Sequence, residues 1–235
     1  MKELIGIIGG AGPLAASHMQ HKLMAASARE YGARKDEQFP SIICLNYPIQ
    51  GITEKGLMDE SLALNDLSSR FNVLTAMNCN NAVLCCGSLH HLQTHLPSEV
   101  NILNWIEKGV HVLKQSKKTK IGVVGSFSSL SHGLYQSALE KEGLLSAHTP
   151  TAIQDQIDGL IELGMSGACE EIMSTHAQSI INFFQSEGCD AVWWACTDLF
   201  NVPSHCSSLF SINSINLMVD CILEKTMSTS KEVLA

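Results

Sequence analysis

The most constraining feature of this 235-residue sequence is a segment that occurs twice. Residues 5–9, Ile-Gly-Ile-Ile-Gly, are matched by residues 121–125, Ile-Gly-Val-Val-Gly. Each copy is a short β-branched run, followed by small residues and then by a helical pattern, which predicts a strand, a turn and a helix. At the same offset the matching positions after the turn are Leu14 with Leu130, Gln20 with Gln136, and Leu23 with Leu139.

A second pair of matching segments consists of apolar strands that end on a cysteine. Residues 81–86 read Asn-Ala-Val-Leu-Cys-Cys, and residues 190–196 read Asp-Ala-Val-Trp-Trp-Ala-Cys. Unrelated strand–helix units also look alike, because sheet cores favour Val, Ile and Gly, but cysteines at matched strand ends favour a duplication. Short strands are expected at 41–46, 100–104 and 208–213, and helices at 13–31, 57–76, 104–116, 130–142, 153–163 and 167–187.

Alternating strands and helices indicate parallel sheets covered by helices. We therefore predict an α/β protein made of two duplicated, pseudo-symmetric αβα subdomains. Each has a mostly parallel four-stranded sheet, and the active site lies in the cleft between them. The first half is expected at 1–114 together with a C-terminal helix in 214–235, and the second at 115–213. A Lys/Ser/Thr-rich stretch at 114–120 marks the junction.

Composition excludes several classes of function. The formal net charge is −8 and the densest basic cluster is only Lys117 to Lys120, which disfavours a nucleic-acid partner. No apolar run is long enough to span a bilayer, and the turn at 9–13 would break the apolar helix of a signal peptide. The nine cysteines are odd in number and irregularly spaced, as is typical of reduced thiols. We expect a cytoplasmic protein with a small-molecule partner.

The two strand-end cysteines, Cys86 and Cys196, are the candidate catalytic residues. Ligands of parallel sheets bind at the carboxyl ends of strands, where each half would contribute one thiol to a shared cleft. Inverting a carbon requires a base on one face and an acid on the other, and a thiol titrates close enough to neutral pH to serve as either. The small-residue turns expected at this edge are 9–13, 86–88, 125–129 and 196–198.

Four short motifs follow one another along the chain. They read Gly-Gly-Ala-Gly-Pro-Leu-Ala at 9–15, Cys-Gly-Ser-Leu-His at 86–90, Ser-Phe-Ser-Ser at 126–129 with Gly-Leu-Tyr at 133–135, and Cys-Thr-Asp-Leu at 196–199. These motifs resemble those of the aspartate/glutamate racemase family, a cofactor-independent group with relatives that act on hydantoins. Each motif is weak alone, but four in the right order are specific, and the resemblance covers nearly the whole chain.

The resemblance implies a PLP-independent amino-acid racemase in which Cys86 and Cys196 are the acid–base pair. It implies no pyridoxal phosphate, no metal and often a homodimer. Substrate contacts are implied at Ser88, Ser126, Ser129 and Thr197, and the further candidate substrate-binding residues are Gly10, Ala11, Gln50, Gly87, Glu162 and Asp198.

Three departures from the family pattern bear on the substrate. Gly87 stands where the family has an asparagine, and Glu162 falls where a lysine is common. The turn at 48–53 contains no arginine that could pair with a side-chain carboxylate. Because an unpaired charge in a closed cleft is costly, we expect a racemase whose substrate differs from aspartate.

Other interpretations stay open on sequence alone. A decarboxylase or isomerase of a small carboxylic acid, and a non-enzymatic binding protein, would suit the same fold. Gly10, Gly12 and Ala15 also fit a dinucleotide fingerprint, but the second strand does not end on the acidic residue that an NAD-dependent dehydrogenase needs. His90, His91 and His95 suggest zinc, yet no further ligand is spaced to complete a tetrahedral site.

Overall fold

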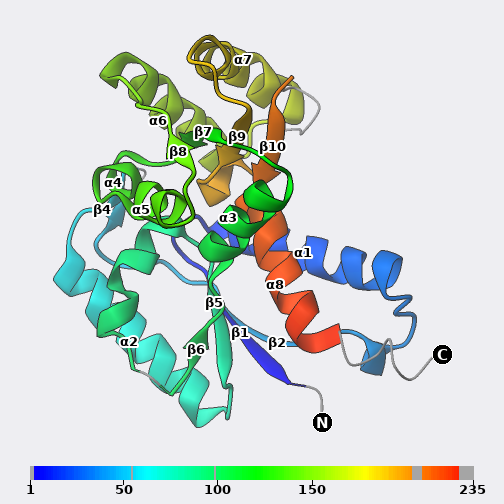
Figure 1. The fold of residues 1–235 in the computed structure, drawn as a ribbon. Coiled ribbons are helices and arrows are strands. Elements are labelled where there is room, and N and C mark those ends of the chain that lie inside the picture. Colours follow the sequence, from blue (N-terminus) through cyan, green and yellow to red (C-terminus); the bar gives the residue numbers. More distant parts are fainter. Residues whose placement is uncertain (1–2, 54, 98, 203–207, 228–235) are drawn as a thin grey trace.

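Two four-stranded parallel sheets carry the fold (Figure 1). The computed structural model describes residues 3–53, 55–97, 99–202 and 208–227. The first sheet has the order β2-β1-β5-β6, and the second has the same order, β8-β7-β9-β10. The predicted pair of duplicated sheets is therefore confirmed. The strands are β1 (Leu4–Ile8), β2 (Ser41–Leu45), β5 (Asn81–Leu84), β6 (Asn101–Ile102), β7 (Lys120–Val124), β8 (Leu145–Ser146), β9 (Ala191–Trp194) and β10 (Phe210–Asn213).

The helices follow the expected segments, with two differences near the cleft. The helix expected from residue 57 begins at Glu60, because residues 52–57 form a hairpin and the Asp59 carboxylate caps the backbone N–H of Leu62. The helix expected at 130–142 is split in two, because Gly133 adopts a left-handed conformation with φ of 66°. The helices are α1 (Pro13–Glu30), α2 (Glu60–Ala76), α3 (Trp105–Gln115), α4 (Phe127–Ser131), α5 (Leu134–Lys141), α6 (Thr151–Met165), α7 (Glu170–Ser186) and α8 (Ser214–Met227), with 3₁₀ segments η1 (Asp36–Gln38), η2 (Gly87–His95) and η3 (Thr197–Leu199) and the hairpin strands β3 (Ile52–Thr53) and β4 (Gly56–Leu57).

The duplication extends to the helices that follow the last strand of each sheet. The Asn104 side chain accepts from backbone N–H groups at the start of α3, and Asn213 accepts from Ile215 at the start of α8. The first residue of each helix then donates a hydrogen bond back to the end of a cysteine-bearing strand. Trp105 Nε1 donates to the carbonyl of Leu84, and Ser214 Oγ donates to that of Ala195. Each thiol turn is thus braced by the helix that follows the last strand of its sheet.

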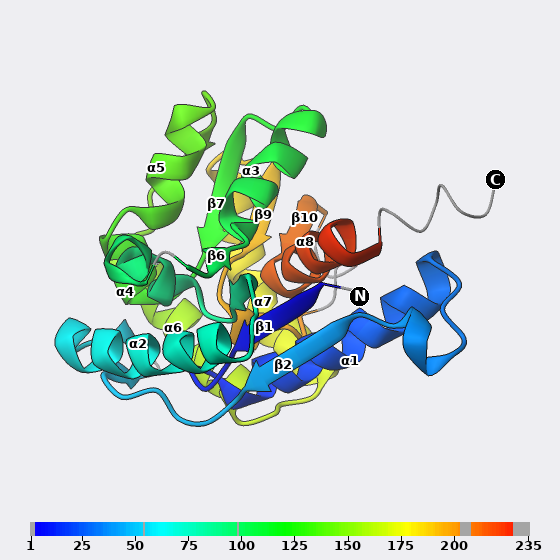
Figure 2. The same cartoon turned by 90° about the horizontal axis from the view of Figure 1, so that it is seen from below.

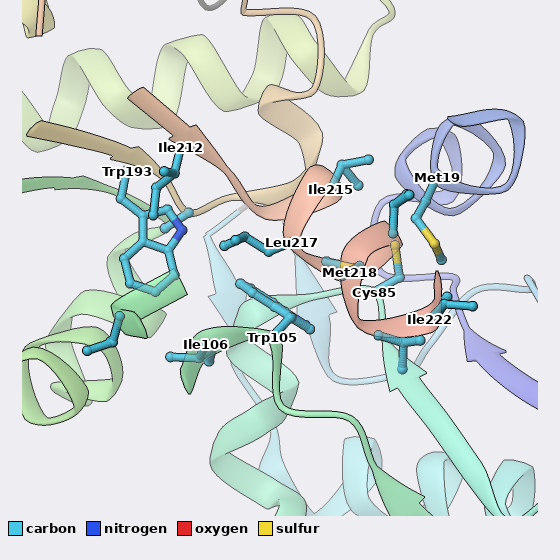
Figure 3. Packing of buried hydrophobic residues seen from close by; sticks show 14 of the residues in the cluster. Met19, Cys85, Trp105, Ile106, Trp193, Ile212, Ile215, Leu217, Met218 and Ile222 are labelled. Carbon is cyan, nitrogen blue, oxygen red and sulfur yellow. The ribbon is translucent and has the colours of Figure 1, made fainter. Parts of the chain in front are cut away.

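The core consists of three hydrophobic clusters. The outer face of the first sheet packs under α2, and the outer face of the second packs under α6 and α7. The third cluster joins the inner faces of both sheets with α1, α3, α5 and α8. Figure 3 shows this central cluster, in which Trp105, Trp193 and Leu217 meet between the halves. Burial of large aromatic side chains here holds the two halves in one orientation.

The last helix packs against the first half. Helix α8 lies beside α1 and α3, as Figure 2 shows from below. This packing supports grouping the end of the chain with residues 1–114, although residues 228–235 lie outside the described ranges. The division of the chain at 114/115 stays a prediction. None of the described helices combines the length and apolar character that a bilayer span requires.

The close approach of α3 to the central cluster predicts that Gly109→Ala destabilises the protein. A Cβ at Gly109 would lie 2.5 Å from the Trp193 ring and 2.9 Å from Leu217. The overpacking, typically about 1–3 kcal/mol, should exceed the gain of about 1 kcal/mol in helix propensity. Gly159→Ala in α6 is the matched control, since nothing lies within 4 Å of its Cβ position, and it should stabilise. Urea unfolding of both variants measures the change in the free energy of unfolding. A Gly109→Ala variant more stable than wild type would contradict the close packing at this position.

Candidate active site

A cavity of about 330 Å³ lies where the turns of the two sheets converge. Four turns contribute to its wall, and each follows the carboxyl end of a strand: β1, β5, β7 or β9. This is the edge at which parallel sheets bind ligands. Both candidate catalytic cysteines line this cavity, together with Gly10, Ala11, Gly87, Ser88, Ser126, Ser129, Thr197 and Asp198.

Cys86 and its neighbour Cys85 have opposite surroundings, because successive side chains of an extended chain point to opposite sides. Cys85 is completely buried in the central cluster, and Figure 3 shows it among Met19, Met218 and Ile222. Cys86 instead lines the cavity. The strand geometry therefore separates a structural thiol from one that a ligand can reach.

Both cavity thiols are held in the protonated form. Burial, together with a smaller contribution from the nearby Asp198 carboxylate, raises the pKa of Cys86 to about 11. Backbone N–H groups of Ser88 and Leu89 and the Ser88 hydroxyl act in the opposite direction, because they stabilise a thiolate. Burial and Asp198 also raise the pKa of Cys196. The charge on Cys86 raises it too, by a smaller electrostatic effect.

Asp198 is a buried carboxylic acid directly beside the second thiol. Its Oδ2 lies 4.0 Å from Cys196 Sγ, at the limit of a sulfur hydrogen bond, and its Oδ1 is buried without a hydrogen-bond partner in the described structure. Burial raises the pKa of this carboxyl to about 7. A Cβ at Gly12, whose φ is 79°, would lie 2.3 Å from Oδ1, so the turn after β1 must carry glycine here.

A row of serine hydroxyls forms another part of the wall. Ser126 Oγ lies 3.1 Å from both Ser88 Oγ and Ser129 Oγ, which links residues of the two halves. The β3–β4 hairpin closes over this row, since a Cβ at Gly56 would lie 2.9 Å from the hydroxyls of Ser88 and Ser126. The hairpin is fixed there by the backbone N–H of Leu57, which donates to Ser128 Oγ.

Two further buried hydrogen bonds hold the turns that carry the thiols, the first between the two turns and the second from α5. The Thr197 hydroxyl donates to the carbonyl of Cys85 at 3.2 Å, and the Tyr135 hydroxyl donates to that of Ala195 at 3.1 Å. The Tyr135 oxygen also fills the space next to Gly87, where a Cβ would lie only 2.1 Å away. A side chain at position 87 would therefore require the tyrosine hydroxyl to move.

The remaining wall is apolar apart from Thr53. Ile49 and Ile52 contribute from the segment after β2, and Ile161 and Met165 contribute from one face of α6. No lysine or arginine of the described chain is among the lining residues. Arg70 lies nearby but is completely buried, and its guanidinium hydrogen-bonds Asp66 and the carbonyl oxygens of Gly9, Leu45, Tyr47 and Pro48.

Two of the residues proposed from the sequence are not among those that line the cavity. Glu162 follows Ile161 on α6, and a single helical step turns its exposed side chain away from the face that carries Ile161 and Met165. Gln50 is also exposed, because its neighbour Ile49 takes the inward position.

Sequence reasoning missed three kinds of lining residue. Tyr135 lies inside one of the four motifs, but the motif does not predict its place beside Gly87, which depends on how the halves meet. The Ile161–Met165 spacing was a detectable helical face. Ile52, Thr53 and Gly56 of the hairpin also line the cavity, and no local pattern in the sequence predicts this.

Comparison with known proteins identifies relatives over nearly the full chain. The family model for Asp/Glu/hydantoin racemases matches residues 8–220. The broad specificity amino-acid racemase RacX of Bacillus subtilis is 22% identical over 238 residues, which cover 96% of this chain and 97% of the relative.

Solved structures share the fold. An aspartate racemase of Picrophilus torridus superposes with a TM-score of 0.79 at 20% identity, covering 94% of this chain and 93% of that one. Glutamate racemase of Francisella tularensis, in complex with D-glutamate, gives a TM-score of 0.67 at 13% identity, covering 99% and 83%.

The buried carboxyl predicts that Asp198→Asn stabilises the protein at alkaline pH. Because folding raises the pKa of Asp198 from 3.8 to about 7, this carboxyl lowers the stability progressively as the pH rises from 3.8 to 7, and the penalty is complete above pH 7 and absent below pH 3.8. The amide carries no such penalty. We expect Asp198→Asn to change the free energy of unfolding more favourably at pH 8 than at pH 4, by on the order of 3 kcal/mol.

Urea unfolding of wild type and variant at both pH values measures this difference. Asp155→Asn, at an exposed position of α6, is the control and should show no such pH dependence. If Asp198→Asn changed the free energy of unfolding equally at pH 4 and pH 8, ionisation of the buried carboxyl would not oppose folding, and the prediction would be wrong.

Proposed function

This chain belongs to the Asp/Glu/hydantoin racemase family, a family of isomerases, and we propose that it is an amino-acid racemase in which Cys86 and Cys196 exchange the Cα proton. The observation that carries the proposal is that two thiols at equivalent strand ends of duplicated sheets line a single cavity. Inversion requires a base and an acid on opposite faces of one carbon, and this pair is the natural candidate.

In the proposed reaction one cysteine acts as thiolate and removes the Cα proton. The C–H electron pair moves into an enolate-like carbanion, and the other thiol then donates its proton to the opposite face. The thiolate has passed from one cysteine to the other, and the roles reverse for the other enantiomer. The backbone N–H groups of Ser88 and Leu89 stabilise the charge at Cys86, while Asp198 raises its thiol pKa.

The ammonium group of a substrate would correct the charge balance of the cavity. Asp198 and a thiolate are two negative charges in a buried site whose lining contains no cationic side chain among the described residues. We propose that Asp198 receives the ammonium, which favours both ionised groups. The hydroxyls of Ser88, Ser126 and Ser129 lie together and are the donors that we assign to the substrate carboxylate.

The apolar wall supports a substrate with an uncharged side chain. Ile49, Ile52, Ile161 and Met165 offer no partner to a second carboxylate, and Asp198 would repel one. Leaving that charge unpaired in the closed cavity costs several kcal/mol. The similarity to a relative named for broad specificity agrees with this assignment. The expected homodimer and cytoplasmic location stay predictions.

The two-thiol mechanism predicts that Cys86→Ser and Cys196→Ser each reduce inversion by at least about 1,000-fold, because a serine hydroxyl is far too weak an acid to exchange the proton at neutral pH. Chiral chromatography of a neutral L-amino acid after incubation measures the product. Cys169→Ser removes an exposed thiol at the start of α7 and is the control. Undiminished inversion in either cavity variant would refute the mechanism.

The apolar wall predicts a preference among substrates. We expect kcat/KM for neutral aliphatic amino acids to exceed that for aspartate by about 100-fold, corresponding to roughly 3 kcal/mol of unpaired charge. Met165→Lys places an ammonium group at the wall and should narrow this ratio. Glu162→Lys is the matched control, because it adds a lysine on the same helix outside the cavity lining. Aspartate as the single fast substrate would contradict the assignment.

A further inference from the structure

A cluster of three metal-ligand side chains lies outside the cavity. We propose that Glu60, His91 and His132 form a site for one divalent transition-metal ion, with Zn²⁺ the best chemical match. Their ligand atoms all lie within 4.8 Å of one another. This site is independent of the racemase proposal, since none of the three residues lines the cavity.

The ligand set and its spacing fit zinc. Two imidazole nitrogens and one carboxylate oxygen, with a fourth position left to water, are a common zinc environment. His91 Nε2 lies 3.4 Å from Glu60 Oε1, and His132 Nε2 lies 3.9 Å from the same oxygen. Ligands about 2.0–2.2 Å from a tetrahedral ion are separated by about 3.3–3.6 Å. A small rotation of exposed side chains would therefore complete the geometry.

The hydrogen bonding of His132 prepares it to coordinate through Nε2. Its Nδ1 lies 2.7 Å from the carbonyl oxygen of Ser128, which can accept only from a protonated nitrogen. The lone pair is then on Nε2, the atom that faces Glu60. Metal-binding histidines are characteristically oriented in this way by a carbonyl or carboxylate on the other ring nitrogen.

The two imidazole rings are close neighbours at the same carboxylate. The His91 and His132 rings stack with centroids 4.2 Å apart and planes inclined by 26°, so they must turn apart for their Nε2 lone pairs to converge on one ion. Both Nε2 atoms already lie beside the same Glu60 oxygen. Side-chain exposures of 57% for Glu60, 39% for His91 and 33% for His132 leave the site accessible to an ion from solvent.

A metal here would connect the two halves of the chain. Glu60 begins α2 and His91 lies on η2, whereas His132 ends α4 in the second half. Close by, the hairpin residue Leu57 is already hydrogen-bonded to Ser128. A bound ion would fix the end of α4, which carries Ser129 of the cavity, against α2 and η2 of the first half.

The sequence offered no route to this site. The sequence places His91 next to His90 and His95, but His90 is buried against Trp105 and burial lowers its pKa to about 4. The partners of His91 instead come from distant segments that only the fold brings together. This proposal therefore revises the expectation from the sequence that the chain has no metal site.

Cobalt titration of the reduced, metal-free protein tests the site, since Co²⁺ reports its ligands by visible absorption. We expect one equivalent to bind with d–d bands and no sulfur-to-cobalt charge transfer. Glu60→Gln and His132→Gln should each weaken binding by at least about tenfold, in line with the effect of disturbing ligand shells. His95→Gln, which removes an exposed histidine of the same segment, should not weaken it.

A second readout does not depend on spectroscopy. Zn²⁺ should raise the melting temperature of wild type more than that of His132→Gln, because an ion bound to the folded state stabilises it. Equal cobalt affinity in wild type and His132→Gln, bands from thiolate ligation alone, or no saturable binding would each overturn the proposal. Racemase activity enters none of these measurements, so its absence would leave the result intact.

Discussion

The arrangement of the cavity depends on buried hydrogen bonds that hold the turns carrying the thiols. Thr197 donates to the carbonyl of Cys85 in the other half, and Tyr135 on α5 donates to the carbonyl of Ala195. A backbone carbonyl left unpaired in the core costs roughly 1–3 kcal/mol. The Thr197 bond therefore ties the two turns to each other, and the Tyr135 bond fixes the second turn to the helix beside it. The absence of a side chain at Gly87 follows directly, because the Tyr135 hydroxyl occupies that space.

The electrostatics of the cavity oppose the stability of the free protein. Two thiols and Asp198 are buried together, and no cationic side chain of the described chain lines the cavity. The pKa of each group is consequently raised, mainly by burial. A site of this kind is poorly suited to hold negative charge until a cation enters, and an amino-acid ammonium supplies one. Such a conflict between stability and function is common where a site must favour a charged reaction state.

The sequence predicted the fold well because the duplication left matching strands and thiols at fixed places along the chain. The parallel strands of both sheets, except the short edge strand β8 (Leu145–Ser146), and the different settings of Cys85 and Cys86 follow from local patterns of apolar residues. Gln50 and Glu162 were proposed by position within motifs, and a shift of one residue along each segment placed Ile49 and Ile161 at the cavity instead. Such shifts are invisible to a motif but decisive on a helix, where each step turns the side chain by about 100°.

Contacts between distant segments were beyond sequence reasoning. The cluster of Glu60, His91 and His132 and the place of Tyr135 both depend on how the two halves meet. That meeting is set by the central core, in which Trp105 and Trp193 are completely buried between the halves. No local pattern specifies which side chains such an interface brings together.

Incubation of neutral L-amino acids with the enzyme in heavy water tests the two-thiol account most directly. The account predicts that the D-product carries deuterium at Cα, since the proton is returned by a thiol that exchanges with solvent. It also predicts that the reaction proceeds without added cofactor. Formation of D-product that retains the original Cα hydrogen, or no exchange in any neutral amino acid, would contradict it.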